Sequence, residues 1–201
     1  MNFGIAVASA IDSWKHVKRA EELGFSSSWF YDTQLLNPDI FICMALAAEK
    51  TSRIRLGTGV LIPSNRIEPV TANALATLNR IAPGRVDFGV GTGFTARRTM
   101  GLKAIPLRTM KRYIERVQEL LRGNLIEWDF ESENRKISFL NPEYGLINLE
   151  DPIDLHISAM GPKSRRLVAE VGAGWINFGS DLESLIRDAE DLKSNWKALQ
   201  G

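Results

Sequence analysis

Short apolar runs alternate with longer amphipathic segments along most of the chain. Each run is rich in Val, Ile or Phe and is followed by a turn and then by apolar positions at helical spacing. Such a repeat is typical of βα units that build a parallel sheet. The pattern predicts six strands, at about residues 3–8, 26–31, 54–60, 86–92, 155–159 and 175–178.

The segments between these strands predict helices. The pair Asn37–Pro38 is suited to open one of them, with Asn37 as the N-cap and Pro38 at the first helical position. The stretch that follows is apolar almost all round from Ile40 to Ala48, which is typical of a buried helix. Another stripe of apolar residues runs from Leu107 to Leu121 in steps of three and four.

Residues 123–153 interrupt this rhythm. Two short apolar stretches, "LIEWDF" and "KISFL", are separated by the polar "ESENR". We therefore expect one domain over residues 1–201, with an insertion at about 123–153 that forms a strand or hairpin outside the main sheet and could cover a site.

The number of units bounds the fold class. Eight βα units close a barrel of typically about 250 residues, whereas this chain has six predicted units in 201 residues. The pattern alone therefore favours an open, doubly wound sheet.

Composition excludes several classes of partner. Hydrophobic residues make up 44% of the chain and charged residues 24%, which is ordinary for a soluble globular protein. The net charge of +1 gives no reason to expect binding to nucleic acid or to an anionic membrane. No apolar run approaches the roughly 20 residues of a membrane span, and the first residues do not resemble a signal peptide. The single cysteine, Cys43, lies in an apolar run, so we expect a buried, inert thiol and a cytoplasmic location.

Candidate chemistry lies at the carboxyl ends of the strands, where ligands bind in parallel α/β folds. Asp32 is the first charged residue after the second strand, and it is either a functional acid or a turn residue. Paired glycines lie on one face of the third strand (57 and 59) and of the fourth (89 and 91). They predict either the close approach of a flat ring or tight packing.

The fifth predicted strand places His156 and Ser158 on one face, and His156 is either a satisfied interior histidine or a catalyst. Gly161 and Pro162 follow, and Lys163 begins a basic helix start. Free N–H groups and positive side chains in a first helical turn suit an anion, although a solvated cap is the alternative.

Other motifs give little support to other classes. "GTGFTA" fits a dinucleotide-binding pattern, but it follows the fourth strand and does not open the fold, so a Rossmann-type dehydrogenase ranks last. The chain has no Walker loop, no nucleophile elbow and no cluster at metal-ligand spacing. Hydrolase and metal-enzyme functions therefore have no support, and we predict no metal site.

Five segments occur in an order that resembles one enzyme family. They are "LGFSSSWFYD", "AAEKTSRIRLGTGVLIP", "EPVTANALATLNRIAPGRVDFGVGTG", "RYIERVQELLRGN" and "ISAMGPKSRRLVAEVGAGWINFG". In order and spacing the chain resembles the luciferase-like oxidoreductases, most of all the deazaflavin-dependent branch typified by methylenetetrahydromethanopterin reductases. The resemblance extends from Asn2 to about Gly179.

The resemblance implies a TIM-type (β/α)8 barrel truncated to about six βα units, in which the coenzyme ring lies across the carboxyl ends of the strands. The implied coenzyme is an 8-hydroxy-5-deazaflavin, with FMN as the alternative. A non-proline cis peptide on the third strand would fall at Gly59–Val60 and press against the back of the ring. The implied cofactor-binding residues are Asp32, Gly59, Val60, Gly91, Thr92, Ser158, Gly161, Pro162 and Lys163.

Two departures from the family pattern affect the prediction. Thr33 stands where many relatives have a histidine, so an acid or base that acts there in some members is absent, and the catalytic residues stay unknown. The usual "DGW" is "AGW" at residues 173–175, and the last two βα units are missing. We therefore expect a fragment, a shortened homologue or one half of a dimer.

The predicted function is hydride transfer between a deazaflavin and a small organic substrate. The alternatives are an FMN-dependent monooxygenase and a shortened, non-catalytic flavin-binding or assembly relative.

Overall fold

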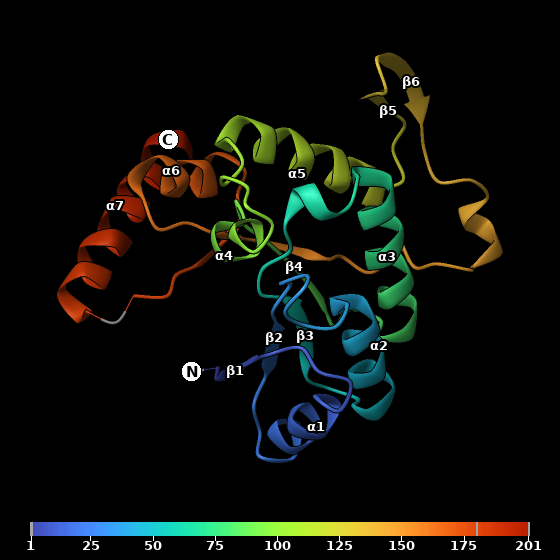
Figure 1. Ribbon diagram of the computed structural model, residues 1–201, viewed down its shortest axis with the longest axis horizontal. Coiled ribbons are helices and arrows are strands. Elements are labelled where there is room, and N and C mark those ends of the chain that lie inside the picture. Colours follow the sequence, from blue (N-terminus) through green and yellow to red (C-terminus); the bar gives the residue numbers. More distant parts are fainter. Residues whose placement is uncertain (1, 180, 201) are drawn as a thin grey trace.

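The computed structural model describes residues 2–179 and 181–200 (Figure 1). Six strands form one curled sheet in the order β1-β2-β3-β4-β7-β8, and all neighbours are parallel. The strands are β1 (Gly4–Val7), β2 (Ser27–Phe30), β3 (Arg55–Thr58), β4 (Val86–Val90), β7 (Asp154–Ser158) and β8 (Gly174–Ile176).

This strand order decides between the two predicted fold classes. A doubly wound sheet reverses its strand order at a switch point, whereas these strands follow one another in chain order. The curled sheet is therefore an incomplete TIM-type barrel of six βα units. The open, doubly wound sheet favoured by the unit count was wrong, and the truncated barrel implied by the family resemblance is confirmed.

The helices cover the convex side of the sheet (Figure 1). They are α1 (Trp14–Glu22), α2 (Ile40–Lys50), α3 (Glu68–Ile81), α4 (Phe94–Arg98), α5 (Leu107–Leu121), α6 (Pro162–Glu170) and α7 (Leu182–Gln200). Two short 3₁₀ turns, η1 (Pro63–Asn65) and η2 (Pro142–Tyr144), lie in connections.

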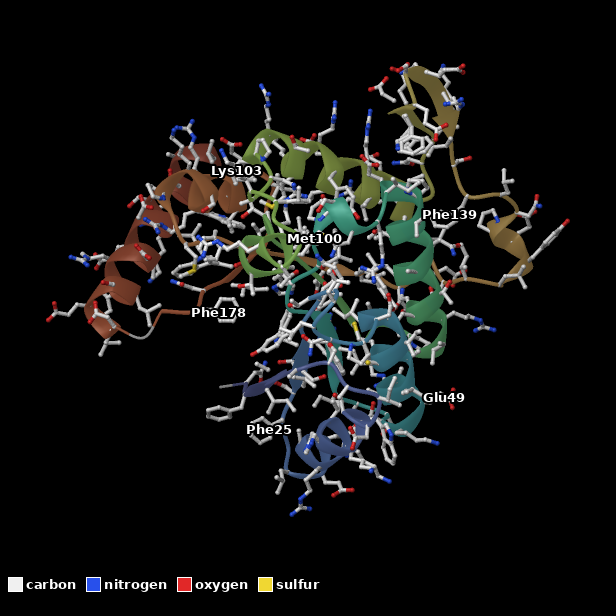
Figure 2. The ribbon with its side chains drawn as sticks, viewed as in Figure 1. Phe25, Glu49, Met100, Lys103, Phe139 and Phe178 are labelled. Carbon is white, nitrogen blue, oxygen red and sulfur yellow. The ribbon has the colours of Figure 1, made fainter. Side chains whose placement is uncertain are left out.

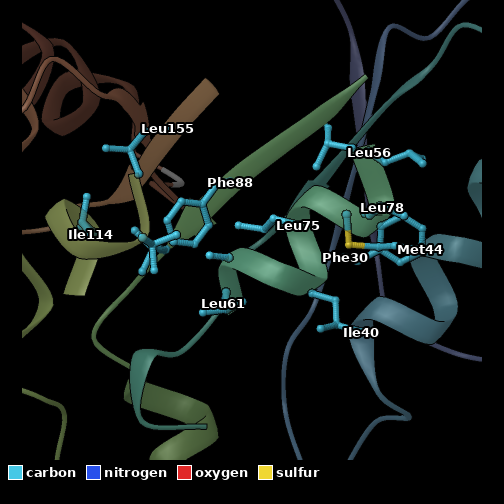
Figure 3. Packing of buried hydrophobic residues seen from close by; sticks show 14 of the residues in the cluster. Phe30, Ile40, Met44, Leu56, Leu61, Leu75, Leu78, Phe88, Ile114 and Leu155 are labelled. Atoms are coloured by element: carbon cyan, nitrogen blue, oxygen red, sulfur yellow. The ribbon is translucent and has the colours of Figure 1, made fainter. Parts of the chain in front are cut away.

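Alternate strand residues build the hydrophobic core beneath these helices. Phe30, Leu56 and Phe88 point from three neighbouring strands toward α2, α3 and α5, and all are at most 1% exposed (Figure 3). Successive side chains of a strand point to opposite faces, so the residues between them face the concave side. Cys43 is buried in the same core, and burial raises the pKa of its thiol.

The start of α2 differs from the prediction. Asp39 caps the helix, because its Oδ1 accepts hydrogen bonds from the N–H groups of Phe41 (2.9 Å) and Ile42 (3.2 Å). Asn37 instead donates through its amide to the carbonyl of Ser9 at 3.2 Å. The prediction of Asn37 as the cap was therefore wrong by two positions.

The insertion forms a separate antiparallel hairpin of β5 (Ile126–Phe130) and β6 (Glu133–Ile137). Trp128 donates through Nε1 to Glu68 of α3 at 3.1 Å, and Arg116 of α5 lies 2.8 Å from Asp129. The hairpin outside the main sheet is confirmed. The hairpin packs on α3 and α5. None of its residues lines the cavity on the concave face of the sheet that is described below, so the structure does not support the prediction that the insertion covers a site at that cavity.

The sheet has two open edges. β1 pairs with β2 alone, and β8 pairs with β7 alone. Along each of these strands one row of backbone groups is free to pair with another strand. Over the described ranges, no helix has the length and apolar character to cross a membrane.

Candidate functional site

A cavity of about 310 Å³ lies on the concave face, between the first strands and the last strands of the sheet. We call it the lumen cavity. It is lined by Ala6, Trp29, Tyr31, Gly59, His156, Trp175, Ile176, Asn177 and Phe178. Figure 2 shows Phe178 on the connection beyond β8, where it is 60% exposed. A second cavity of about 320 Å³, which includes Asp151 and Pro152, lies before β7 at the opposite end of the strands and away from these residues.

Trp29 fills much of the space that the paired glycines provide. A β-carbon added to Gly57 would lie 2.5 Å from Cε3 of Trp29, and one added to Gly59 would lie 2.8 Å from its Cβ. Gly89 is equally restricted, because its β-carbon would overlap the carbonyl oxygen of Thr58. At Gly57 and Gly89, which are buried, the tight-packing alternative holds, and the flat ring over Gly57 is the indole of the chain itself.

His156 is an interior histidine with a defined partner. Its Nε2 lies 3.4 Å from Oδ1 of Asp87, and its ring meets that of Trp29 edge-on, with the centroids 4.9 Å apart. Arg55 donates hydrogen bonds to both carboxylate oxygens of Asp87, from Nε to Oδ2 (2.9 Å) and from Nη2 to Oδ1 (2.6 Å). Its Nη2 also lies 3.2 Å from Oδ2 of Asp154. Burial opposes ionisation of Asp87, but hydrogen bonds from His156 and Arg55 outweigh it and lower the pKa of the carboxyl.

Cofactor-binding residues predicted on three strands, two for the ring and Ser158 for the phosphate, lie close together at the carboxyl ends of β3, β4 and β7. The Gly59–Val60 peptide is cis, as the resemblance implied. A β-carbon on Gly91 would lie 2.7 Å from Cγ2 of Val60 and 3.4 Å from Cβ of Ser158. Thr92 follows directly and is half-buried. Three predicted contacts from three strands therefore share one small region.

The turn after β7 lies next to this region. Ser164 Oγ accepts the N–H of Gly161 (3.2 Å) and donates to its carbonyl (2.8 Å). The first helical bond runs from Arg165 N–H to the Gly161 carbonyl, so the N–H groups of Lys163 and Ser164 precede the helical ladder. Arg165 forms ion pairs with Asp188 and Asp191 of α7, whereas Pro162 and Lys163 are exposed to solvent.

Asp32 binds the connection that follows β3. Its Oδ2 accepts the N–H of Ile62 and lies 3.2 Å from Nη1 of Arg66, and its side chain is 5% exposed. Burial raises the pKa of Asp32, although Arg66 opposes this shift. The carboxylate holds the connection after β3, including η1, and does not line the lumen cavity.

Comparison with known proteins places the chain in a family. Residues 8–198 match the family of luciferase-like monooxygenases. The chain belongs to this family.

Relatives of this luciferase-like chain include enzymes named for coenzyme F420. It is 31% identical over 182 residues to a 5,10-methylenetetrahydromethanopterin reductase of Archaeoglobus fulgidus, a match that covers 87% of this chain and 52% of that protein. It is 33% identical over 183 residues to an F420-dependent glucose-6-phosphate dehydrogenase of Kineococcus radiotolerans, covering 83% and 52%. The luciferase-like chain thus spans about half the length of these relatives.

Solved structures share the fold. A coenzyme F420-dependent tetrahydromethanopterin reductase from Methanopyrus kandleri superposes with a TM-score of 0.85 at 22% identity, covering 99% of this chain and 62% of that chain. A type II Baeyer–Villiger monooxygenase from Pseudomonas putida in complex with FMN gives 0.81 at 15% identity, covering 99% and 64%.

Sequence reasoning missed several residues of this luciferase-like site. Trp29 shares a strand face with Tyr31, and this alternation was the available signal that the indole points to the concave side. Arg66 gave no signal, because its pairing with Asp32 depends on how the connection after β3 folds back. Asn177 also gave none, and its Oδ1 is buried without a hydrogen-bond partner among the described residues.

The geometry around Val60 leaves a narrow space beside the backbone of the luciferase-like chain. Gly59 and Val60 are half-buried beside Gly91, where any side chain on the glycine would overlap Val60. A narrow platform without a side chain at Gly91 suits a flat ring, and the turn at Gly161–Lys163 suits a phosphate. The residues therefore fit this coenzyme class.

Proposed function

We propose that this chain carries the coenzyme site of a deazaflavin-dependent oxidoreductase that acts on an organic substrate. One observation carries the proposal: Val60, Gly91 and Ser158 converge next to the turn at Gly161–Lys163. The name of the F420-dependent glucose-6-phosphate dehydrogenase supports the same coenzyme class, because F420 is a deazaflavin.

Each residue has a distinct role in this proposal. Gly59 and Val60 support the back of the ring, and Gly91 and Thr92 contact its edge. Ser158, Gly161, Pro162 and Lys163 hold the phosphate, through the N–H groups of the first helical turn and the ammonium of Lys163. Asp32 acts at a distance, because it fixes the connection that follows Val60. The bound coenzyme would supply a carbon that accepts or gives hydride, while the protein supplies position and excludes water.

An FMN-dependent monooxygenase is the alternative of the same class, and an FMN-bound neighbour shares the fold. A deazaflavin has carbon where flavin has its N5, so the two functions differ in whether oxygen is consumed. The open edges of β1 and β8 and the presence of Thr33 favour a third candidate, a shortened non-catalytic relative. That candidate would bind a coenzyme without turnover.

The partner of the open edges is a further part of the proposal. We propose that a second copy of the chain or an additional segment pairs with β1 and β8 and completes the barrel wall. Analytical ultracentrifugation, combined with the intact mass of the natural protein, distinguishes a dimer from a longer chain.

A fluorescence titration with the deazaflavin coenzyme and, separately, with FMN tests the proposed function. We expect the deazaflavin to bind, and Lys163→Ala to weaken binding about tenfold, as is typical of a lost charged hydrogen bond. Arg166→Ala is the matched control, because Arg166 lies on the same helix and pairs with Glu170 at 3.2 Å. Absence of binding by either coenzyme, or equal effects of the two substitutions, would contradict the proposal.

A further inference from the structure

We propose that two copies of this chain associate across α5, with the insertion of each copy packed on a basic surface of the other. We call residues 94–116 the basic segment and residues 123–153 the acidic arm. The contact goes beyond the proposed function, because it contains none of the proposed cofactor-binding residues and does not involve the open edges of β1 and β8.

Opposite charges are separated along this part of the chain, although the net charge of the whole protein is only +1. The basic segment has seven Lys and Arg residues and one acidic residue, Glu115. The acidic arm has seven Asp and Glu residues and two basic residues. Figure 2 shows Lys103 next to the start of α5 and Phe139 of the arm beyond its end. Each copy therefore carries a basic surface and an acidic surface at opposite ends of one helix.

Many of these charges have no partner of opposite sign within the chain. The ion pairs that α5 forms in the described residues involve its other basic side chains, so Arg108 and Arg112 are exposed without one. Four exposed glutamates of the arm are likewise without an ion pair in this part of the chain: Glu127, Glu131, Glu143 and Glu150. Free charges of opposite sign on two surfaces of one chain are complementary between two copies, and they define the orientation of docking.

The outer stripe of α5 is complementary to itself. Arg108, Arg112, Glu115 and Glu119 follow one another at steps of four, three and four, which places them on one face of the helix. In an antiparallel pair of α5 helices centred on the middle of this stripe, Arg112 of one copy faces Glu115 of the other. Arg108 then faces Glu119, which is shared with side chains at the end of its own helix. A two-fold axis repeats each contact, so the pairing closes as a dimer.

Exposed apolar side chains accompany the charges on both surfaces. On the arm, Leu140, Tyr144 and Leu146 lie around η2, and each is more than two-thirds exposed. The basic segment exposes Phe94 and Leu102. Apolar surface rimmed by charge is typical of a protein–protein contact. Antiparallel α5 helices bring the arm of one copy, which follows the end of its α5, to the start of the other α5, where the basic segment lies.

The acidic arm is fixed in place before any docking. Its hairpin is attached to α3 and α5 through Trp128 and Asp129. Its later part is attached to α3, because the amides of Asn79 and Asn148 each donate to the backbone carbonyl of the other residue, at 3.3 and 3.2 Å. A surface that is already ordered loses less conformational entropy when it binds. The insertion does not cover the lumen cavity, and docking gives it a role.

A charge swap tests the inference by sedimentation velocity of the full chain over a range of concentrations. We expect the natural chain to dimerise, and Arg112→Glu and Glu115→Arg each to raise the dissociation constant roughly tenfold, because each substitution places like charges opposite one another twice. The double variant Arg112→Glu/Glu115→Arg should restore the dimer, since it only exchanges the two partners. Lys18→Glu is the matched control, because Lys18 is exposed on α1 and the change in net charge is the same as for Arg112→Glu.

Salt and the acidic arm provide two further readouts. The dimer should weaken as NaCl rises from about 0.05 to about 0.5 M, and Leu146→Ser should weaken it without any change in net charge. A dimer formed through β1 and β8 is held by backbone hydrogen bonds, so neither charge substitution would affect it. Such a dimer, a natural chain that stays monomeric, or a double variant as weak as the single ones would overturn the inference. None of these outcomes depends on whether the coenzyme binds, so the proposed function is tested separately.

Discussion

The carboxylate of Asp32 and the guanidinium of Arg66 form a buried ion pair, with Oδ2 and Nη1 3.2 Å apart. Arg66 is 16% exposed and also contacts Asp39, whose side chain is 41% exposed. The pair joins the end of β2 to the connection that follows β3. It therefore fixes the backbone next to Val60 without touching the lumen cavity.

Asp32→Asn should lower the free energy of unfolding by about 3 kcal/mol, because it leaves a largely buried guanidinium with one exposed partner. Asp39→Asn is the matched control and should cost less than about 1 kcal/mol, since an exposed ion pair contributes little and Asn caps a helix as well as Asp. Urea unfolding monitored by circular dichroism measures both values. Equal decreases in the free energy of unfolding for the two variants would show that the buried carboxylate of Asp32 contributes no more to stability than the exposed one of Asp39.

Gly57→Ala should destabilise the protein by roughly 1–3 kcal/mol, because the new methyl group and Cε3 of Trp29 would be 2.5 Å apart. The indole must then move away from β3, which should also alter tryptophan fluorescence. Trp29→Leu removes the ring, so the Gly57→Ala change should cost less in that background. Additive losses in the double-mutant cycle would argue against direct contact.

Asp87 should make stability depend on pH in the acid range. Its pKa in the folded chain lies below the ordinary value of 3.8, so the unfolded chain binds more protons between the two values. The stabilisation is present above pH 3.8 and is lost as the pH falls through the lower folded-state pKa.

Asp87→Asn should cost roughly 3 kcal/mol near neutral pH, because Arg55 and His156 lose their buried acceptor. The difference in urea midpoint between the natural protein and this variant should shrink as the pH falls below about 4. Other carboxylates titrate in both proteins, so the difference isolates Asp87. A difference that stays constant over this range would contradict the assignment.

The strands could be predicted because each is a short apolar run, and the six predicted runs contain or overlap the six strands of the sheet. Three of the predicted cofactor-binding residues lie close together for the same reason: parallel strands bring their carboxyl ends to one edge, so Val60, Gly91 and Ser158 meet. The order of the strands in the sheet follows neither from the apolar runs nor from the residues at the strand ends. The family resemblance was therefore needed to choose the barrel over the doubly wound sheet.

Other features depend on contacts that no local pattern encodes. Gly57 and Gly59 have the spacing of a ligand platform, yet the chain fills the space over Gly57 with Trp29 from the neighbouring strand. Asp32 follows its strand as a functional acid would, but Arg66, 34 positions later, engages it. Both outcomes are set by packing across strands and not by the residues nearby in sequence.

A crystal structure of the chain with the deazaflavin coenzyme tests the central claim most directly. The account predicts that the ring lies against Val60 and Gly91, with its phosphate at the N–H groups of Lys163 and Ser164. A coenzyme bound elsewhere on the chain, or a chain that binds none under these conditions, would contradict the account.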